Sequence, residues 1–515
     1  MSFRFPVSAL PQLWSRAALL GLMLCMSTAA TGWSQVSLPN VFSDHMVLQR
    51  NQPNKVWGKA KAGEKVTVKI GDQNHAATAD SAGMWQVMLS PLAVGGTHTL
   101  EISGAKNTIR IVDVLVGEVW VCSGQSNMAW KVSNAYDPDL EALAANYPQI
   151  RMINFPQVGT QEPVWEHPQS QWMVCSPQTV PNFSAVGYFF GRQLHETLDI
   201  PIGLINNAWG GSAAEAWISR SELEKAGNYS ALLKRADDSA QQYEQLASKA
   251  QKSEEDNKQI ESLKRQLSGN QRPANIYNGV LKSHVGYGIR GAIWYQGESN
   301  AGRAYQYRDL FPLMISSWRK EWGQGDFPFY WVQLADYMQE QSEPKESAWA
   351  ELREAQTMTM SKLKNTGEAV IIDIGEGKDI HPKNKVDVGR RLARLALDND
   401  YGFDIASRSP RYKSMEKADG KLVLTFEHVD EGWRPFDTAE PVGFAIAGED
   451  KKFVWATAKI LKDGRIEVSS KDVANPVAAR YAWGDNPVSN MFDGANLPLT
   501  PFRTDDWSGV TVDNK

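Results

Sequence analysis

The chain has 515 residues, which is too long for a single hydrophobic core, so the usual size of domains predicts roughly three. Its formal net charge is -5, and acidic and basic residues are mixed along the sequence. A chain of this kind has no electrostatic footprint for nucleic acid or for an anionic membrane surface, which argues against both as partners.

The N-terminal segment, residues 1–34, has the pattern of a signal peptide. Arg4 and Arg16 precede an apolar stretch, residues 17–26, and small residues follow it. The stretch is too short to span a bilayer. We therefore expect cleavage after Ala30 or Ser34, and a mature protein that is exported to the periplasm or secreted without inserting into a membrane.

Residues 36–112 alternate between apolar and polar side chains in short runs, for example over residues 65–70 and 98–102. Glycine, aspartate and asparagine separate these runs. Alternation with a period of two, interrupted by frequent turns, predicts a small β-sandwich-like domain. Such a domain either binds carbohydrate or packs against its neighbour and shapes it, and we favour the packing role.

Residues 113–404 follow a different pattern, in which apolar runs alternate with helical stretches. This pattern predicts an α/β domain with a mostly parallel sheet. Each predicted strand ends in a loop rich in glycine, serine, asparagine or aspartate. Ligands bind at the carboxyl ends of the strands in such sheets, so these loops are where catalytic residues are expected. The predicted strands are residues 114–122, 202–208, 291–295, 329–334 and 369–374.

Two further segments complete the expected organisation. Residues 219–272 are polar, with apolar residues at helical spacing such as Ile260, Leu263 and Leu267, and predict an inserted helical hairpin. Its apolar seam is short, so we favour a solvated insertion over a coiled-coil contact between two copies of the chain. The oligomeric state stays unknown. Residues 405–515 return to strand-like alternation and predict a second β-domain.

Ser126 follows the first predicted α/β strand, in a turn that begins with Gly124. A serine in such a turn can be held exposed, with its own backbone N–H directed at the carbonyl that it attacks. The serine also fits an ordinary helix N-cap. The G-x-S-x-G signature is absent because Met128 occupies the last glycine position. Ser126 alone is therefore a weak signal for a nucleophile.

The next two strands end in motifs that suit an oxyanion hole. The pair Gly210 and Gly211 lets a backbone N–H approach a ligand closely. Gln296 and Asn300 offer side-chain N–H groups, and we expect one of them to complete the hole. Each motif alone also fits a structural role, the glycine pair as a tight turn and Glu298 as a buried acid.

Among the 8 histidines, only His381 sits in a glycine-rich loop after an α/β strand, with Asp379 beside it. Such a pair fits a general base and the acid that orients it. The same spacing is common in turns and helix caps. Since Ser126 lies 255 residues earlier, a triad would have to be assembled by the fold.

The sequence implies no metal site. The histidines are scattered, and Cys122 and Cys175, the two cysteines outside the signal segment, lack the spacing of zinc ligands. Both cysteines lie among apolar residues. A disulfide between them and two buried free thiols are equally compatible with the sequence.

Four motifs in this order resemble those of the sialate O-acetylesterase family of SGNH hydrolases. They are residues 124–128 (Gly-Gln-Ser-Asn-Met), 209–211 (Trp-Gly-Gly), 294–300 (Trp-Tyr-Gln-Gly-Glu-Ser-Asn) and 379–385 (Asp-Ile-His-Pro-Lys-Asn-Lys). Residues 42–50, 349–356 and 481–487 are also typical of the family, so the resemblance covers nearly the whole mature chain. It implies an α/β fold in which a three-layer SGNH hydrolase domain stands between the two β-domains.

The resemblance also implies roles for particular residues. Ser126 would be the nucleophile and His381 its base. The backbone N–H groups of Ser126 and Gly211 would form the oxyanion hole, together with a side chain from the third motif, Gln296 or Asn300.

The sequence departs from the family pattern at one position. Many SGNH enzymes place the acid of the triad three residues before the histidine, where this chain has Lys378. Asp379 is the obvious substitute. Backbone carbonyls are the alternative partners for His381.

The implied activity is hydrolysis of acetyl esters on sugars through an acetyl-serine intermediate, with no cofactor. The substrate would be an O-acetylated carbohydrate, either a sialic acid or a plant polysaccharide such as xylan or xyloglucan. A lipid or lysophospholipid hydrolase would share the nucleophile but needs an apolar acyl channel. A non-catalytic glycan-binding protein would explain the β-domains and the 19 tryptophans, but not the four loops.

Overall fold

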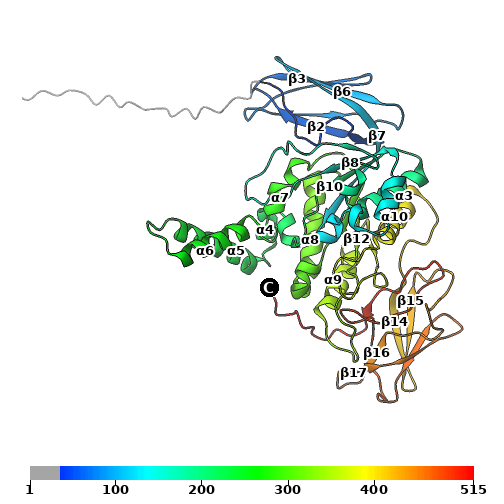
Figure 1. Ribbon diagram of the computed structural model, residues 1–515. Helices are drawn as coiled ribbons and strands as arrows, with labels where there is room; N and C mark the ends of the chain where they lie inside the picture. Colours follow the sequence, from blue (N-terminus) through cyan, green and yellow to red (C-terminus); the bar gives the residue numbers. More distant parts are fainter. Residues whose placement is uncertain (1–34) are drawn as a thin grey trace, which may run out of the picture.

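The central element of the fold is a β-sheet (Figure 1). The predicted catalytic loops follow the carboxyl ends of its strands. The computed structural model describes residues 35–515, so the predicted signal peptide lies outside the described residues. All neighbouring strands pair in parallel except β9, which pairs antiparallel with β8. In sheet order the strands are β13 (Thr366–Ala369), β12 (Phe329–Val332), β11 (Gly291–Tyr295), β7 (Thr108–Gly124), β10 (Ile202–Asn206), β8 (Tyr147–Asn154) and β9 (Met173–Cys175).

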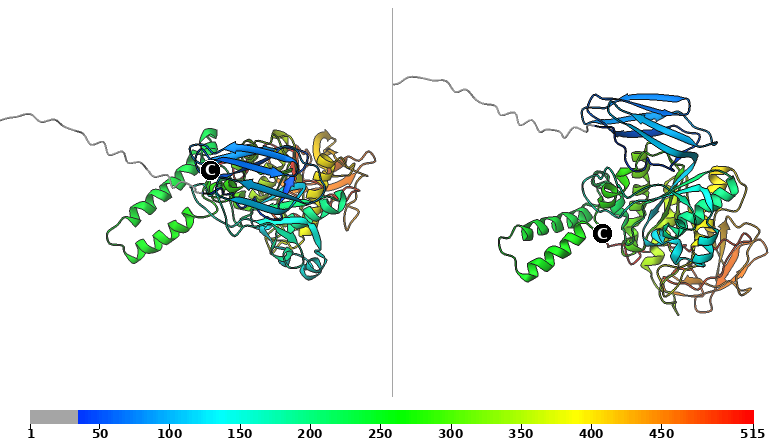
Figure 2. Two further views of the ribbon diagram at one scale, coloured as in Figure 1. Left: turned by 90° about the horizontal axis from the view of Figure 1, so that it is seen from above. Right: turned by 45° about the horizontal axis from the view of Figure 1, so that its top comes forward.

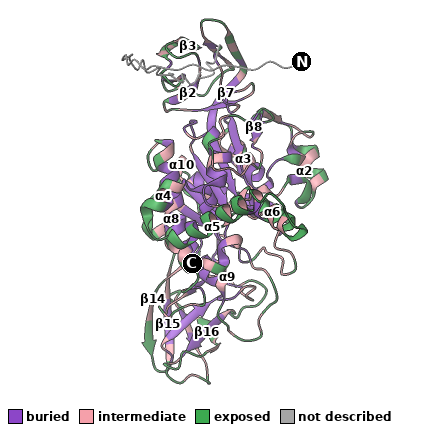
Figure 3. Ribbon diagram, turned by 90° about the vertical axis from the view of Figure 1, so that its left-hand side faces the viewer, coloured by how far each residue is buried: buried purple, intermediate pink, exposed green. Residues whose placement is uncertain are grey.

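Helices cover both faces of this sheet. Successive residues of a strand point to opposite faces, so Trp120 and Cys122 pack beneath α3 (Ala185–Leu198) and α10 (Lys385–Tyr401). Val121 belongs to the opposite cluster, under α8 (Ala304–Trp322) and α9 (Ala348–Lys362). Burial of both strand faces explains the continuous apolar runs in the sequence (Figure 3). The finding confirms the mixed α/β class.

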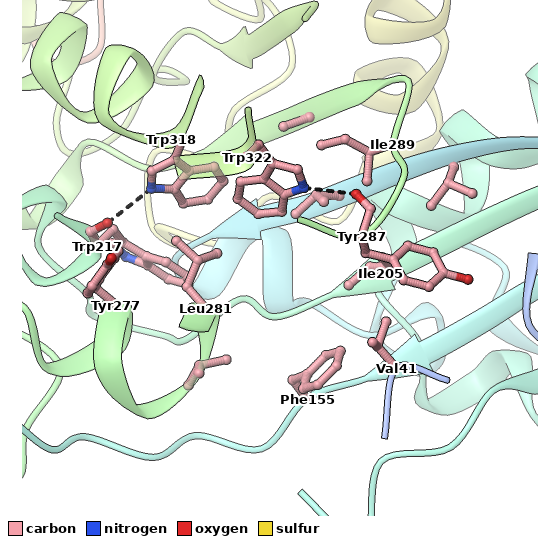
Figure 4. Close-up of a cluster of buried hydrophobic side chains, with 14 of the residues drawn as sticks. Val41, Phe155, Ile205, Trp217, Tyr277, Leu281, Tyr287, Ile289, Trp318 and Trp322 are labelled. Carbon is pink, nitrogen blue, oxygen red and sulfur yellow. Dashed lines mark hydrogen bonds between the residues drawn. The ribbon is translucent and has the colours of Figure 1, made fainter. Parts of the chain in front are cut away.

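Several tryptophans belong to the core rather than to a sugar-binding surface (Figure 4). The indole N–H of Trp318 donates to the carbonyl of Trp217 at 3.0 Å, and that of Trp322 donates to the carbonyl of Tyr287 at 3.0 Å. A buried indole needs such a partner. Core packing therefore explains the presence of these tryptophans.

One N-terminal β-sheet, made by β3, β4 and β6, is continuous with the central sheet through β7, whereas β2 and β5 form a separate two-stranded sheet. The first half of β7 pairs antiparallel with β6, whereas its second half pairs parallel with β10 and β11. The predicted border between residues 112 and 113 thus falls inside a single strand. The other strands here are β1 (Val47–Gln49), β2 (Asn54–Lys59), β3 (Lys65–Ile70), β4 (Gln73–Thr78), β5 (Met84–Leu89) and β6 (His98–Ser103).

A helical hairpin projects from the body of the molecule (Figure 2). It consists of α5 (Ser230–Ala247) and α6 (Glu254–Leu267), which follow α4 (Arg220–Ala226). Ser253 and Asp256 form a capping box that starts α6. The remaining short helices are α1 (Ser126–Ala129), α2 (Pro138–Ala144) and α7 (Asn275–Gly279). Within residues 35–515, no helix is both long and apolar enough to cross a membrane.

The C-terminal residues form two four-stranded sheets around a core of their own. One sheet contains β14 (Arg411–Ala418), β15 (Lys421–Glu427), β19 (Ile466–Ser469) and β18 (Thr457–Ile460). The other contains β17 (Phe453–Trp455), β16 (Phe444–Ala447), β20 (Ala478–Tyr481) and β21 (Phe502–Arg503). The additional β-sheet region expected from the sequence is therefore present.

Cys122 and Cys175 are buried free thiols, so of the two alternatives that the sequence left open for this pair the structure has the reduced one. Cys122 lies on β7 and Cys175 on β9. Burial raises the pKa of both thiols, that of Cys175 to about 12. Neither group is a reactive thiolate.

Candidate active site

Ser126 is held where β7 ends against β11. Gly124, the last residue of β7, has a φ of +133°, and a Cβ there would lie 2.2 Å from the carbonyl oxygen of Tyr295. Only glycine permits this turn and this close approach. The N–H of Gln125 donates to the same carbonyl at 2.9 Å, and α1 begins at Ser126. The packing of two parallel strands therefore fixes the position of the serine.

His381 lies beside Ser126 although it comes from the loop before α10. Its Nε2 is 2.8 Å from the Oγ of Ser126. The ring of Trp130 stacks on the imidazole, with centroids 4.8 Å apart and 14° between the planes. Burial and the charge of Lys385 lower the pKa of His381, and Asp379 opposes them only in part. The imidazole is thus neutral at neutral pH and can accept a proton from the serine.

Asp379 is less closely engaged than the acid of a typical triad. Its Oδ1 accepts the backbone N–H of His381 at 2.9 Å and lies 3.6 Å from Nδ1 of the ring. The second distance is longer than a hydrogen bond, and the carboxylate side chain is 44% exposed. Among residues 35–515, no group makes a hydrogen bond to Nδ1.

The backbone around Gly211 lies next to the serine. A Cβ on Gly210 would be 3.4 Å from the Cβ of Ser126, and the N–H of Trp209 donates to the carbonyl of Gly124 at 3.0 Å. Gly211 has a φ of +71°. Within the described chain, the backbone N–H groups of Ser126 and Gly211 have no hydrogen-bond partner. Both are therefore available to a developing oxyanion.

Gln296 and Asn300, the two side chains expected at the oxyanion hole, make hydrogen bonds to each other and to neighbouring loops. The Nε2 of Gln296 donates to the carbonyl of Ser212 at 3.0 Å and to Oδ1 of Asn300 at 2.7 Å. The Nδ2 of Asn300 donates to Glu215 at 3.0 Å. Both amides are buried. Both N–H groups of Gln296 are engaged within the protein, and the two amides hold the loop that carries Gly211.

A buried polar cluster behind the serine was missed in the sequence. Asn127 donates to Glu298 at 2.7 Å and to the carbonyl of Ile380 at 2.9 Å, and it accepts from Lys385 at 2.6 Å. Glu298 is half-buried, with its Oε2 enclosed by the protein, and desolvation raises its pKa. A lysine at the start of a helix resembles any solvated lysine, so only the spacing within residues 379–385 could have drawn attention to it.

A cavity of about 500 Å³ adjoins the Gly211 loop on the side of the hairpin. Asn270 and Gln271, which line it, donate to the carbonyls of Gly210 and Gly211. Its other lining residues include four arginines, Arg235, Arg265, Arg272 and Arg303. Of these, Arg303 is paired with Glu215. Within residues 35–515, Arg235, Arg265 and Arg272 have no carboxylate within ion-pair distance.

No group of three or more histidine, cysteine, aspartate or glutamate side chains within residues 35–515 is arranged to hold a metal ion. The groups next to the Ser126 hydroxyl are the imidazole of His381 and the backbone around Gly210.

Comparison with known proteins identifies relatives over nearly the whole chain. Sialate O-acetylesterase of Mus musculus is 30% identical over 511 residues, which cover 89% of this chain and 92% of that protein. The enzyme of the same name from Homo sapiens is 28% identical over 510 residues, covering 89% and 91%. A solved carbohydrate acetylesterase from Xanthomonas citri is 36% identical, with a TM-score of 0.79, and covers 92% of this chain and 100% of that one.

The family of carbohydrate esterases described as sialic acid-specific acetylesterases matches residues 116–263 and 258–398. These residues contain all four of the motifs on which the resemblance rested. The chain belongs to this family of carbohydrate esterases.

Proposed function

We propose that the protein is a carbohydrate O-acetylesterase of the SGNH type, with Ser126 as nucleophile and His381 as general base. The observation that carries this proposal is the 2.8 Å contact between Nε2 of His381 and Oγ of Ser126, at the carboxyl end of a central parallel strand. The family to which the chain belongs supports the same chemistry.

The proposed reaction is a two-step acyl transfer. Oγ of Ser126 attacks the acetyl carbonyl while its proton passes to Nε2 of His381. The N–H groups of Ser126 and Gly211 stabilise the oxyanion, each by about 3 to 4 kcal/mol. The imidazolium then protonates the departing sugar oxygen, which leaves as a hydroxyl group, and a water deprotonated by His381 attacks the acetyl-serine. Acetate leaves and Ser126 regains its proton.

The arginine-lined cavity favours an acetylated sugar that carries a carboxylate. Guanidinium groups without a carboxylate partner attract anions, and Arg235, Arg265 and Arg272 line one cavity beside the loop of Gly211. A sialic acid meets this requirement, whereas unsubstituted xylan does not. The charged lining also argues against the alternative of a lipid hydrolase, which needs an apolar acyl channel.

An acetate-release assay across substrates tests this function. Acetate is expected from O-acetylated sialic acids, and with a lower kcat/KM from acetylated xylan and xyloglucan. Release of long fatty acids instead would point to the lipid hydrolase. Failure to cleave any ester, including nitrophenyl acetate, would favour a non-catalytic glycan-binding protein.

An arginine variant separates the substrate class from the chemistry. Changing Arg235 and Arg265 together to glutamine is expected to raise KM for the acidic sugar about tenfold or more, because hydrogen bonds to charged groups contribute about 1.5 to 3 kcal/mol. The kcat for nitrophenyl acetate should stay the same. Lys234→Gln is the matched control, since Lys234 lies on the same helix but pairs with Asp238 at the surface. An equal rise in KM for the acidic sugar in the arginine double variant and in Lys234→Gln would contradict the proposed carboxylate site.

The role of Asp379 is a separate prediction. An acid that is essential to a triad costs about 10⁴-fold in kcat when replaced by asparagine. Because the Asp379 carboxylate is half exposed and 3.6 Å from Nδ1, we expect Asp379→Asn to cost only about tenfold. Steady-state kinetics on the purified variant decides this. A loss near 10⁴-fold would mean that the carboxylate closes onto Nδ1 during the reaction.

We also propose that residues 1–34 direct export and are then removed, on the pattern of charge and apolar residues described above. An exported esterase would meet glycans outside the cytoplasm. N-terminal sequencing of the protein from its native host tests this, and a mature protein that begins at Met1 would contradict it.

A further inference from the structure

Lys385 is an unusual lysine because its whole side chain is buried at the start of α10, close to the catalytic residues. Its ammonium lies 5.3 Å from the ring centroid of Tyr295 and 5.9 Å from that of Trp130. Burial lowers its pKa to about 7. Burying a cation costs free energy, so a contact in the folded protein must compensate for it.

The contact is with Asn127, the residue after the nucleophile. The Nζ of Lys385 donates to Oδ1 of Asn127 at 2.6 Å, and the Nδ2 of Asn127 donates to the carbonyl of Ile380 at 2.9 Å. A protonated lysine only donates and a carbonyl only accepts. The amide can therefore satisfy both neighbours in one orientation only, with its oxygen toward Lys385.

This orientation connects the two catalytic segments. Asn127 is one residue from Ser126, and Ile380 is one residue from His381. The Asn127 amide thus fastens the base loop to the turn of the nucleophile. Its second N–H donates to Oε1 of Glu298, whose Oε2 has no partner within the described residues.

We propose that Lys385 is a positioning residue of the esterase site: it fixes the Asn127 amide that joins the segments of Ser126 and His381, and it brings a positive charge to these segments. The inference rests on the proposed function and assigns a role to a residue outside the set of reacting groups. The ammonium of Lys385 acts on the reaction through its hydrogen bond to Asn127 and through its electrostatic effect on His381.

The charges around His381 give the sign of the field effect. Lys385 is the cation that faces it from α10, and Asp379 is the anion in its own loop. From α1 and the residue after it come the Ser126 hydroxyl and the neutral Trp130 ring. Glu298 and Glu376 act on Lys385 itself. A nearby cation disfavours imidazolium, so Lys385 lowers the pKa of His381. Because the base must be neutral, this charge extends activity to lower pH.

Two variants of Lys385 separate the hydrogen bond from the charge. Lys385→Gln keeps an N–H donor for Asn127 but removes the charge, whereas Lys385→Met removes both. In the Gln variant we expect the acid limb of the kcat/KM profile to move to higher pH, with kcat at the plateau lowered by about tenfold at most. In the Met variant we expect the same movement and a loss in kcat of about a hundredfold, as for a slightly misplaced base.

Lys378→Met is the matched control. Lys378 is exposed in the same loop and carries the same charge, but solvent screens it. Its removal should leave both kcat and the acid limb as in the wild type. A purely structural role of Lys385 would lower activity equally at every pH, without moving the limb.

Titration of His381 by NMR provides a test that needs no turnover. Its pKa is expected to rise in both Lys385 variants and not in Lys378→Met. An unchanged His381 pKa in folded Lys385→Gln would overturn the proposal, as would a shift of equal size in Lys378→Met. If the His381 pKa rises as expected but no ester is cleaved by the wild type, the proposed function fails while the electrostatic coupling stands.

Discussion

Ser126→Ala is expected to lower acetylesterase kcat/KM by about 10⁵-fold or more, the size of effect seen when a nucleophilic serine is removed. The change deletes the oxygen that would form the acetyl ester and that lies 2.8 Å from His381. It should not disturb the fold, because Ser126 lies at a turn and the alanine side chain fits within the space of the serine. Hydrolysis of nitrophenyl acetate and thermal unfolding of the same preparation measure both effects.

A second serine on the same strand provides the control. Ser123 is fully buried on β7, and its hydroxyl has no partner within the described residues. Ser123→Ala therefore removes an unsatisfied polar atom and should leave activity unchanged and stability equal or higher. If a folded Ser126→Ala protein kept a tenth of the activity, the nucleophile would have to be another residue.

His381→Ala is expected to cause a loss of comparable size, because Ser126 would then have no base within reach. Groups that act as one unit give non-additive losses. The double variant with Ser126→Ala should accordingly be no less active than either single variant. Loss of activity in the wild type as pH falls should occur below the ordinary pKa of an imidazole, since burial and Lys385 lower that of His381.

The residual activity of His381→Ala should lack this acid limb. His98 is the control position, because it lies on β6 in the N-terminal sheet, and His98→Ala should behave as the wild type. An acid limb that persists in His381→Ala would assign the titration to another group and contradict the role given to His381.

The sequence predicted those parts of the site that depend on a strand and the turn after it. The apolar run before Gly124 required a buried strand, and the glycine required a sharp turn, so the location of Ser126 followed. His381 was found because it was the single histidine in a loop of the right kind. The family resemblance supplied the pairing of these two residues, which lie 255 positions apart.

Other features depend on three-dimensional contacts that no local pattern encodes. The hydrogen bonds of Gln296 to the carbonyl of Ser212 and of Asn300 to Glu215 join segments that lie far apart in the sequence. Lys385 has the sequence context of a surface lysine, and only the fold buries its side chain beside the ring of Tyr295. The change of pattern near residue 112 marked a change of partners within β7 rather than the end of an element.

The unbroken course of β7 limits how this enzyme can be rearranged in evolution. A gene fusion or deletion at the junction would cut one strand that belongs to two sheets, and would also remove Arg50, which pairs with the buried Glu118 in the middle of that strand. Of its ion-pair partners among the described residues, Glu118 would then keep Arg290. The N-terminal β region is therefore not an exchangeable accessory module. By contrast, the loop between α5 and α6 is exposed, so inherited insertions can accumulate there without touching the strand that carries the nucleophile.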